Sequence, residues 1–232
     1  MNDARHDGTP GPEKRALLKL GILCGVLAPL LWASAIVFCG TLRPGYSHFA
    51  QYISELGERG SSTELLMRYA AFVPTGLMHL AFAGALATTF RSSRLGVVAA
   101  MLLGLNGLAR IGAGFFPCEL GCDPTGSLGQ RMHSLSAGVG FLALVAAAVL
   151  WGAVLKRTRD LRDLTSYSVV SGVLGFAFLL LMLWSAEHGT ARGLFERLSS
   201  GVLSLWILVF ALRLRPCPSA PPSPPPAAGP SA

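Results

Sequence analysis

The sequence predicts an all-α protein: a polytopic bundle of six transmembrane helices with a short amphipathic helix in its first exterior loop. The chain is 52% hydrophobic and only 13% charged, about half the charged share of a typical soluble domain. Its apolar residues also form blocks of roughly 20 residues, the length that a helix needs to cross a bilayer core of about 30 Å. Because lipid offers the backbone no hydrogen bonds, such uniformly apolar blocks are expected to be helices rather than alternating barrel strands.

Six blocks make up the membrane domain, which is predicted over residues 17–214. They cover residues 17–39, 65–90, 95–116, 132–155, 165–186 and about 195–214. The first block is interpreted as a signal anchor, because its apolar run is longer than that of a cleavable signal peptide and lacks a convincing cleavage site. Residues 1–16, which are polar, and residues 215–232, which are rich in Pro, Ala and Ser, are predicted to be disordered cytoplasmic tails.

The positive charges predict how the chain is oriented. With six spans, both termini and the second and fourth loops share one side of the membrane. Twelve of the 19 Lys and Arg residues fall on that side and six on the other, while Arg110 lies inside a span. The sequence therefore predicts a multi-pass protein of the bacterial plasma membrane with both termini in the cytoplasm. The net charge of +7 does not indicate a nucleic-acid partner, because most of the basic residues are predicted to lie on the cytoplasmic face beside anionic lipid headgroups.

The first exterior loop contains a helical pattern of apolar residues. They recur at i, i+3, i+4 and i+7, as Phe49, Tyr52, Ile53 and Leu56. Ser47 is a suitable N-cap for this helix and Gly57 a suitable stop. We expect the helix to lie on the outer membrane surface with its aromatic side down and a polar face that includes Glu55.

The second exterior loop holds two cysteines, Cys118 and Cys122, in the segment "CELGC". Outside the cytoplasm a disulfide between them becomes plausible, and the glycine and proline nearby allow the chain to bring them together. Free thiols are the first alternative. A two-thiolate metal site is the second, but a single pair at this spacing is weak evidence for zinc, so no metal site is predicted.

Ionisable side chains gather near the exterior ends of the spans. Arg110 lies in the third span, with Asn106 one turn deeper on the same face. An arginine inside a span costs a few kcal/mol unless it snorkels, pairs or faces a cavity. The glycines around it indicate close helix packing. We expect a carboxylate partner for it, with Glu196, Glu55 and Asp123 as candidates.

Histidines supply the other candidate functional groups. His133 opens the fourth span, and a histidine near a carboxylate suits acid–base catalysis or metal binding. It is equally suited to be a polar cap at headgroup level, just as Glu55 suits an exposed helix end. His79, deep in the second span, is interpreted as an interhelical hydrogen-bonding group. Glu196 and Arg197, at the start of the sixth span, are expected to join a structural network more readily than a reaction.

Four stretches carry a resemblance to a known family: "YSHFAQYISELG", "FFPCELGC", "HSLSAGVGF" and "GLFERLSSGVLSLW". Over about residues 17–214 the chain resembles the bacterial domain-of-unknown-function family 998, and it is distantly similar to the six-span FRAG/DRAM group. The resemblance implies a six-helix fold but no reaction. It draws attention to Ser54, Glu55, Gly57, Pro117, His133, Glu196 and Arg197.

Two functions from different classes follow from these residues. The favoured one is binding of a lipid or anionic headgroup in an outward-facing polar pocket lined by Arg110, Asn106, Glu55, His133, Glu196 and Arg197. The alternative is a membrane enzyme, a hydrolase or transferase acting on a lipid or isoprenoid, with Glu55, His133 or Asp123 as catalytic candidates; a small-solute transporter is a weaker third. Signature motifs of metalloproteases, serine hydrolases and P-loop proteins are absent from the sequence. The sequence leaves open whether a cofactor is bound and whether the alternative enzyme would depend on a metal ion. The expected partners are membrane lipids, with a second membrane protein as a further candidate.

Overall fold

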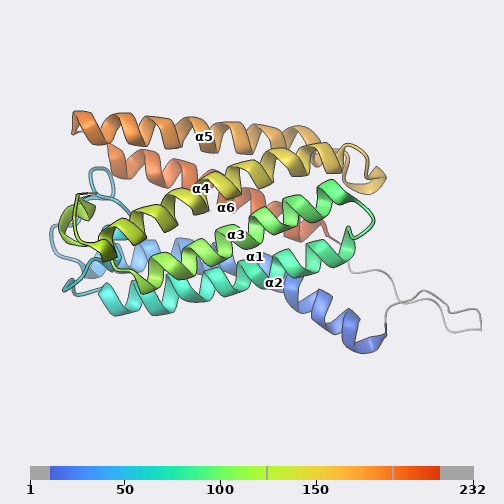
Figure 1. The fold of residues 1–232 in the computed structure, drawn as a ribbon, viewed down its shortest axis with the longest axis horizontal. Coiled ribbons are helices and arrows are strands. Elements are labelled where there is room, and N and C mark those ends of the chain that lie inside the picture. Colours follow the sequence, from blue (N-terminus) through green and yellow to red (C-terminus); the bar gives the residue numbers. More distant parts are fainter. Residues whose placement is uncertain (1–10, 124, 190, 215–232) are drawn as a thin grey trace, which may run out of the picture.

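The computed structural model describes residues 11–214 except residues 124 and 190. Six long helices correspond to the six predicted spans, and all six are long and apolar enough to cross a membrane. They are α1 (Pro12–Leu42), α2 (Val73–Thr89), α3 (Arg94–Phe115), α4 (Leu128–Leu155), α5 (Leu164–His188) and α6 (Arg192–Arg213) (Figure 1). The all-α, six-helix prediction is therefore confirmed, and the chain is a multi-pass membrane protein. Helix α1 already begins at Pro12, within the predicted N-terminal tail, whereas residues 1–10 and 215–232 lie outside the described residues.

The helices run back and forth, and each packs against the next (Figure 1). Helix α6 packs against α1 as well as α5, which closes the bundle. Large apolar side chains remain exposed along the helices, among them Leu23, Val37, Leu108, Leu142, Val173 and Leu205. An exposed apolar surface of this extent suits lipid as the surrounding solvent.

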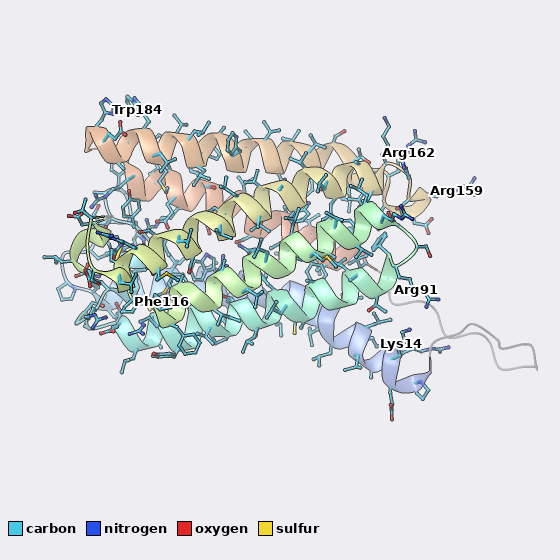
Figure 2. All side chains as sticks on the ribbon, viewed as in Figure 1. Lys14, Arg91, Phe116, Arg159, Arg162 and Trp184 are labelled. Carbon is cyan, nitrogen blue, oxygen red and sulfur yellow. A yellow bond between two sulfur atoms is a disulfide. The ribbon has the colours of Figure 1, made fainter. Side chains whose placement is uncertain are left out.

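The two ends of the bundle differ in charge. Lys14, Arg91, Arg159 and Arg162 lie at one end, which we call the basic end, whereas Phe116 and Trp184 lie at the other (Figure 2). The second end also carries the loop with Cys118 and Cys122, so we call it the cysteine end. The fold thus places these four basic residues, all of which the sequence analysis assigns to one side, at the same end.

Two hydrophobic clusters form the core. The larger one, built around Trp151, Trp206 and Phe210, packs α2, α3, α4 and α6 together. The smaller one contains Trp32 and Phe72 and lies at the cysteine end, where the first loop also contributes to it. The buried aromatic rings meet edge-on or tilted, which adds to the stabilisation from burial itself.

Small residues let neighbouring helices approach closely, as the sequence predicts around Arg110. A Cβ atom added at Gly107 of α3 would lie 2.7 Å from the carbonyl oxygen of Gly76 in α2, and one at Gly76 would lie 2.6 Å from that of Gly107. A Cβ added at Gly112 would lie 2.7 Å from the Ser136 hydroxyl of α4. These contacts hold the backbones of α2, α3 and α4 together near the site described below.

A π-helical turn, η2 (Leu66–Phe72), leads into α2. Pro74 follows it and has no N–H to donate, so the regular α-helical pattern cannot extend back through this position. The turn places the Arg68 guanidinium at the end of α3, where it donates to the carbonyl oxygens of Gly114 at 2.8 Å and Phe115 at 3.1 Å. It also brings Phe72 into the smaller core cluster.

The first loop differs from its prediction. No amphipathic α-helix lies on the membrane surface; the chain makes a turn near Ser47 and then a short 3₁₀ helix, η1 (Ser54–Gly57). Ile53 and Leu56 are almost completely buried in the core, while Phe49 stays 54% exposed. The helical prediction is wrong because Ile53 and Leu56 pack against the helix bundle beneath the loop and not against lipid. Burial in the tertiary structure overrides the local periodicity.

Candidate functional site

A cavity lies at the cysteine end, between α1, η2, α3, α4 and α6, and reaches from the smaller core cluster to the larger one. It contains about 530 Å³ of space free of atoms, including its opening. Its polar lining consists of Ser54, Asn106, Arg110, His133, Ser136, Glu196 and Ser200. Of the six predicted ligand-binding residues, four line this cavity: Arg110, Asn106, His133 and Glu196. The other two, Glu55 and Arg197, do not.

Arg110 projects from α3 into this cavity. Its guanidinium carbon lies 3.9 Å from the centre of the Trp32 ring, a cation–π contact with α1. One of its N–H groups donates to the Thr75 hydroxyl of α2 at 3.3 Å. No carboxylate of the described residues lies within ion-pair distance of Arg110. Of the expected partners, Glu196 lines the same cavity, and its charge acts on the guanidinium without direct contact.

Glu196 enters the cavity from the first turns of α6 and is 8% exposed. One carboxylate oxygen, Oε2, accepts a hydrogen bond from the backbone N–H of Ile53 at 2.6 Å. This bond also fixes the buried first loop to α6. The other oxygen has no donor among the residues that the structure describes, so half of a buried carboxylate remains available to a ligand.

His133 is buried in the first turns of α4, and its two ring nitrogens have different surroundings. Nδ1 lies 2.7 Å from the carbonyl oxygen of Phe116 and 3.2 Å from that of Ala113. A carbonyl oxygen only accepts, so Nδ1 carries the hydrogen and Nε2 of the neutral ring carries a lone pair. Nε2 is buried and has no hydrogen-bond partner among the described residues.

Asn106 lines the cavity, but its amide is already satisfied. Its Oδ1 lies 2.7 Å from Nδ1 of His79, and its Nδ2 donates to the carbonyl oxygen of Gly140 at 2.9 Å. The amide therefore joins α2, α3 and α4 and is not a free ligand-binding group. The same contact gives His79 the interhelical hydrogen bond that the sequence analysis assigns to it.

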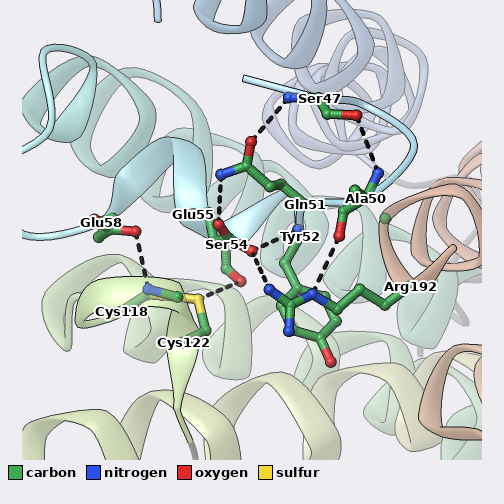
Figure 3. A network of polar contacts seen from close by, with 12 residues as sticks. Ser47, Ala50, Gln51, Tyr52, Ser54, Glu55, Glu58, Cys118, Cys122 and Arg192 are labelled. Atoms are coloured by element: carbon green, nitrogen blue, oxygen red, sulfur yellow. Dashed lines mark hydrogen bonds and ion pairs between the residues drawn. A yellow bond between two sulfur atoms is a disulfide. The ribbon is translucent and has the colours of Figure 1, made fainter. Parts of the chain in front are cut away.

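Glu55 lies outside the cavity, in a polar network of the first loop (Figure 3). Its carboxylate accepts hydrogen bonds from the backbone N–H of Tyr52 at 2.9 Å and from the Gln51 amide at 2.8 Å. Its Oε1 also lies 3.4 Å from the Arg192 guanidinium of α6. With these partners and an exposure of 2%, the carboxylate ties the loop to α6 and is not open to a substrate.

Arg197 belongs to the same scaffold. Its guanidinium donates to the carbonyl oxygen of Gln51 at 2.8 Å, to Nδ1 of His48 at 3.1 Å and to the Tyr46 hydroxyl. Burial raises the pKa of Tyr46 above its usual value, whereas partial burial and the adjacent guanidinium lower the pKa of His48. The network keeps Tyr46 and His48 neutral, and it docks the loop rather than building a reactive site.

The cysteine loop covers this end of the bundle. Cys118 and Cys122 are joined by a disulfide, the first of the three possibilities for this pair. Asp123 is exposed, and its carboxylate accepts hydrogen bonds from the backbone N–H and the hydroxyl of Thr125, which lower its pKa. Asp123 closes its own turn and does not line the cavity, which removes it as a partner for Arg110.

Trp32, Thr75 and Ser200 are parts of the site that the sequence analysis missed. Thr75 holds the Arg110 guanidinium, and Ser200 accepts a 2.9 Å hydrogen bond from the Trp32 indole. These residues look like ordinary members of apolar spans, so only Ser200, within the polar start of the sixth span, gave any signal. The described residues contain no group of three His, Cys, Asp or Glu side chains placed to hold a metal ion.

Together, the cavity offers one guanidinium, one half-satisfied carboxylate and one imidazole lone pair, and the rest of its lining consists of three serines, one bonded asparagine and apolar residues. No curated protein and no solved structure matches the chain. The sequence model of one family, described as "Protein of unknown function (DUF998)", matches residues 26–213, which cover α2 to α6 completely and α1 from Val26 onward. The chain therefore belongs to the DUF998 family.

Proposed function

We propose that this protein binds the anionic group of a membrane lipid in the cavity, with the Arg110 guanidinium as the anion site. The observation that supports the proposal is the position of Arg110: it lies inside a membrane span, lines the cavity and has no carboxylate at ion-pair distance among the described residues. Guanidinium groups hold phosphate and carboxylate oxygens through paired hydrogen bonds. Because a charged side chain inside a membrane span is costly, it is expected to serve a function such as binding a ligand of opposite charge.

The rest of the lining suits a lipid rather than a water-soluble anion. Phe72, Phe141 and Leu144 form much of the wall, which offers apolar surface to the glycerol and upper acyl part of such a molecule. Arg110 lies five residues before the end of α3, which is about 8 Å along the helix axis. A phosphate held by Arg110 would therefore lie somewhat deeper than the headgroups of the surrounding lipids.

We also propose that the cavity faces the outside of a bacterial inner membrane. In that orientation the basic end, with both Pro12 and Arg213, is cytoplasmic, as the distribution of Lys and Arg favours (Figure 2). The Cys118–Cys122 disulfide then lies in an oxidising compartment.

Native mass spectrometry tests the anion site. Delipidated protein would be mixed with phosphatidylglycerol, and bound lipid would be counted for the wild type, Arg110→Gln and Arg131→Gln. Arg110→Gln is expected to lose the lipid, while Arg131→Gln, which removes an exposed arginine near the same end, keeps it. Equal melting temperatures of the three proteins would show that the fold is intact. Equal lipid binding by Arg110→Gln and the wild type would overturn the proposal.

One observation favours the second candidate function, a membrane enzyme. The unpartnered Nε2 of His133 is suited to take a proton from water or a hydroxyl group, and Arg110 would hold the phosphate of the substrate. Incubation of the protein with lipid in vesicles, followed by analysis of the products, tests this candidate. Hydrolysis by the wild type that His133→Asn abolishes would support it, and unchanged lipid after long incubation would exclude it for that lipid.

A further inference from the structure

We propose that the ligand is zwitterionic, with its phosphate held by Arg110 and a neighbouring primary ammonium held by Glu196 and His133. The inference deepens the proposed function and rests on its anion site. It follows from two hydrogen-bond acceptors, Glu196 and His133, that line the same cavity as Arg110. A ligand with only an anionic group would leave both acceptors without a donor.

Both acceptors are buried and incompletely bonded. Glu196 uses Oε2 to accept from the Ile53 N–H, and its second oxygen has no donor among the described residues. His133 points its hydrogen-bearing Nδ1 at the carbonyl oxygens of Ala113 and Phe116, which leaves Nε2 as a lone-pair acceptor without a partner. A buried acceptor without a donor costs free energy, so a ligand N–H directed at Nε2 of His133 would recover that cost. The second oxygen of Glu196 would accept another N–H of the same group.

The charges of the cavity lead to the same ligand class. Arg110 is positive, Glu196 is negative, and the two form no ion pair with each other in the described part of the chain. A purely anionic ligand would satisfy Arg110 but would lie beside a buried carboxylate that repels it. A zwitterion pairs with both charges, and this complementarity would also select against anionic lipids.

The acceptors also select the kind of amine. A primary ammonium has three N–H donors, which suits a carboxylate oxygen and an imidazole lone pair, whereas a quaternary ammonium has none. Quaternary groups are usually held on the faces of aromatic rings. Of the rings that line the cavity, Trp32 already has the Arg110 guanidinium carbon 3.9 Å from its centre, and the centres of the Trp32 and Phe72 rings are 4.9 Å apart. The expected chemistry is therefore that of phosphoethanolamine rather than phosphocholine.

Competition between lipids tests the inference. Delipidated protein would be mixed with phosphatidylethanolamine, phosphatidylglycerol and phosphatidylcholine of the same acyl chains, and native mass spectra would give the bound ratios. The wild type is expected to prefer phosphatidylethanolamine by about tenfold, the value of one charge-assisted hydrogen bond. In Glu196→Gln, whose amide oxygen can still accept from the Ile53 N–H, the amounts of bound phosphatidylethanolamine and phosphatidylglycerol should differ by no more than about twofold. Glu187→Gln, which removes an exposed glutamate near the same end, should leave it unchanged.

His133→Asn serves as the second variant. The asparagine amide replaces the Nδ1 donor toward Phe116 but lacks an acceptor at Nε2, so the preference should fall while the fold is kept. Free phosphoethanolamine forms another arm. Displacement of bound lipid by it would show that the headgroup alone is recognised, and its failure at millimolar concentration would show that the acyl part is needed.

The outcomes separate this inference from the proposed function. If the wild type shows no preference for phosphatidylethanolamine, or if Glu196→Gln keeps that preference, the ammonium site is wrong while the anion site at Arg110 still stands. If Arg110→Gln binds every lipid as the wild type does, both fail together.

Discussion

Replacing Gly193 by alanine tests whether the first loop is held against α6 by direct backbone contact. Gly193 lies in the first turn of α6, where a Cβ atom would be 2.2 Å from the carbonyl oxygen of Gln51 and 2.8 Å from its backbone nitrogen and carbon. Those atoms belong to backbone and cannot rotate away as a flexible side chain would. The loop and the helix must therefore separate by about 1 Å to restore an ordinary carbon–oxygen contact.

The magnitude follows from what this separation disturbs. Overpacking of this kind costs about 1–3 kcal/mol. The shift also strains the 2.9 Å bond from the Leu194 N–H to the Phe49 carbonyl oxygen, and a lost backbone bond adds about 1 kcal/mol. Alanine returns up to about 1 kcal/mol through its higher helix propensity. The net loss of stability is about 1–4 kcal/mol, which corresponds to a fall in melting temperature of roughly 2–16 °C for a chain of this size.

Thermal unfolding in detergent, followed by size-exclusion chromatography, measures this effect. Gly201→Ala is the matched control, because it lies in the same helix and a Cβ atom there meets nothing within 4 Å. The control should melt at the wild-type temperature or up to about 4 °C above it, because alanine has the higher helix propensity. If Gly193→Ala melted together with Gly201→Ala, the close approach of Gln51 to α6 would not hold the loop in place, and the assignment of Glu55 and Arg197 to a docking network would lose its basis.

Three further predictions concern the cysteine end. Without reduction, an alkylating reagent should label Cys24 and Cys39 of the unfolded chain but neither Cys118 nor Cys122, because the latter two are paired; mass spectrometry of the peptides identifies the labelled cysteines, and loss of this short cross-link should cost at most about 2 kcal/mol. The pKa of His48 is lowered from 6.5, so its contribution to stability is complete above pH 6.5 and is lost as the pH falls through the lowered value. The melting temperature of the wild type should therefore fall more between about pH 7.5 and 5 than that of His48→Gln. Glu55→Ala should lower stability by about 2–4 kcal/mol, since it leaves the Tyr52 N–H without its acceptor, and a melting temperature equal to that of the wild type would contradict a structural role.

Much of the fold could be predicted because a membrane imposes simple rules on a sequence. Every span needs a long apolar run with its backbone bonds inside the helix, so hydropathy alone locates all six helices. Periodicity also placed Arg110 and Asn106 on one face of α3, and both line the cavity. The glycines beside Arg110 correctly indicated close contact with neighbouring helices, since Gly107 meets Gly76 of α2.

The first loop could not be predicted in the same way. Whether Ile53 faces lipid or the core depends on α6, which lies about 140 residues further along the chain and holds it through Glu196. Likewise the role of Glu55 depends on Arg192, which no local pattern connects to it. Local periodicity carries no information about such distant partners, and this is why a surface helix was expected where a buried turn is found.

The comparison of Glu55 with Glu196 shows how the structure separates scaffold from site. Both are buried glutamates in short polar segments near the cysteine end, and the sequence treats them alike. Glu55 has donors on both oxygens and lies outside the cavity, whereas Glu196 has a donor on one oxygen and lines it. A scaffold carboxylate is stabilised by completing its bonds, and a binding carboxylate must leave one open at a cost in stability. The incomplete bonding of Glu196, together with that of Arg110 and His133 in the same cavity, is therefore the physical reason to place the ligand there and not at the more conspicuous network of the first loop.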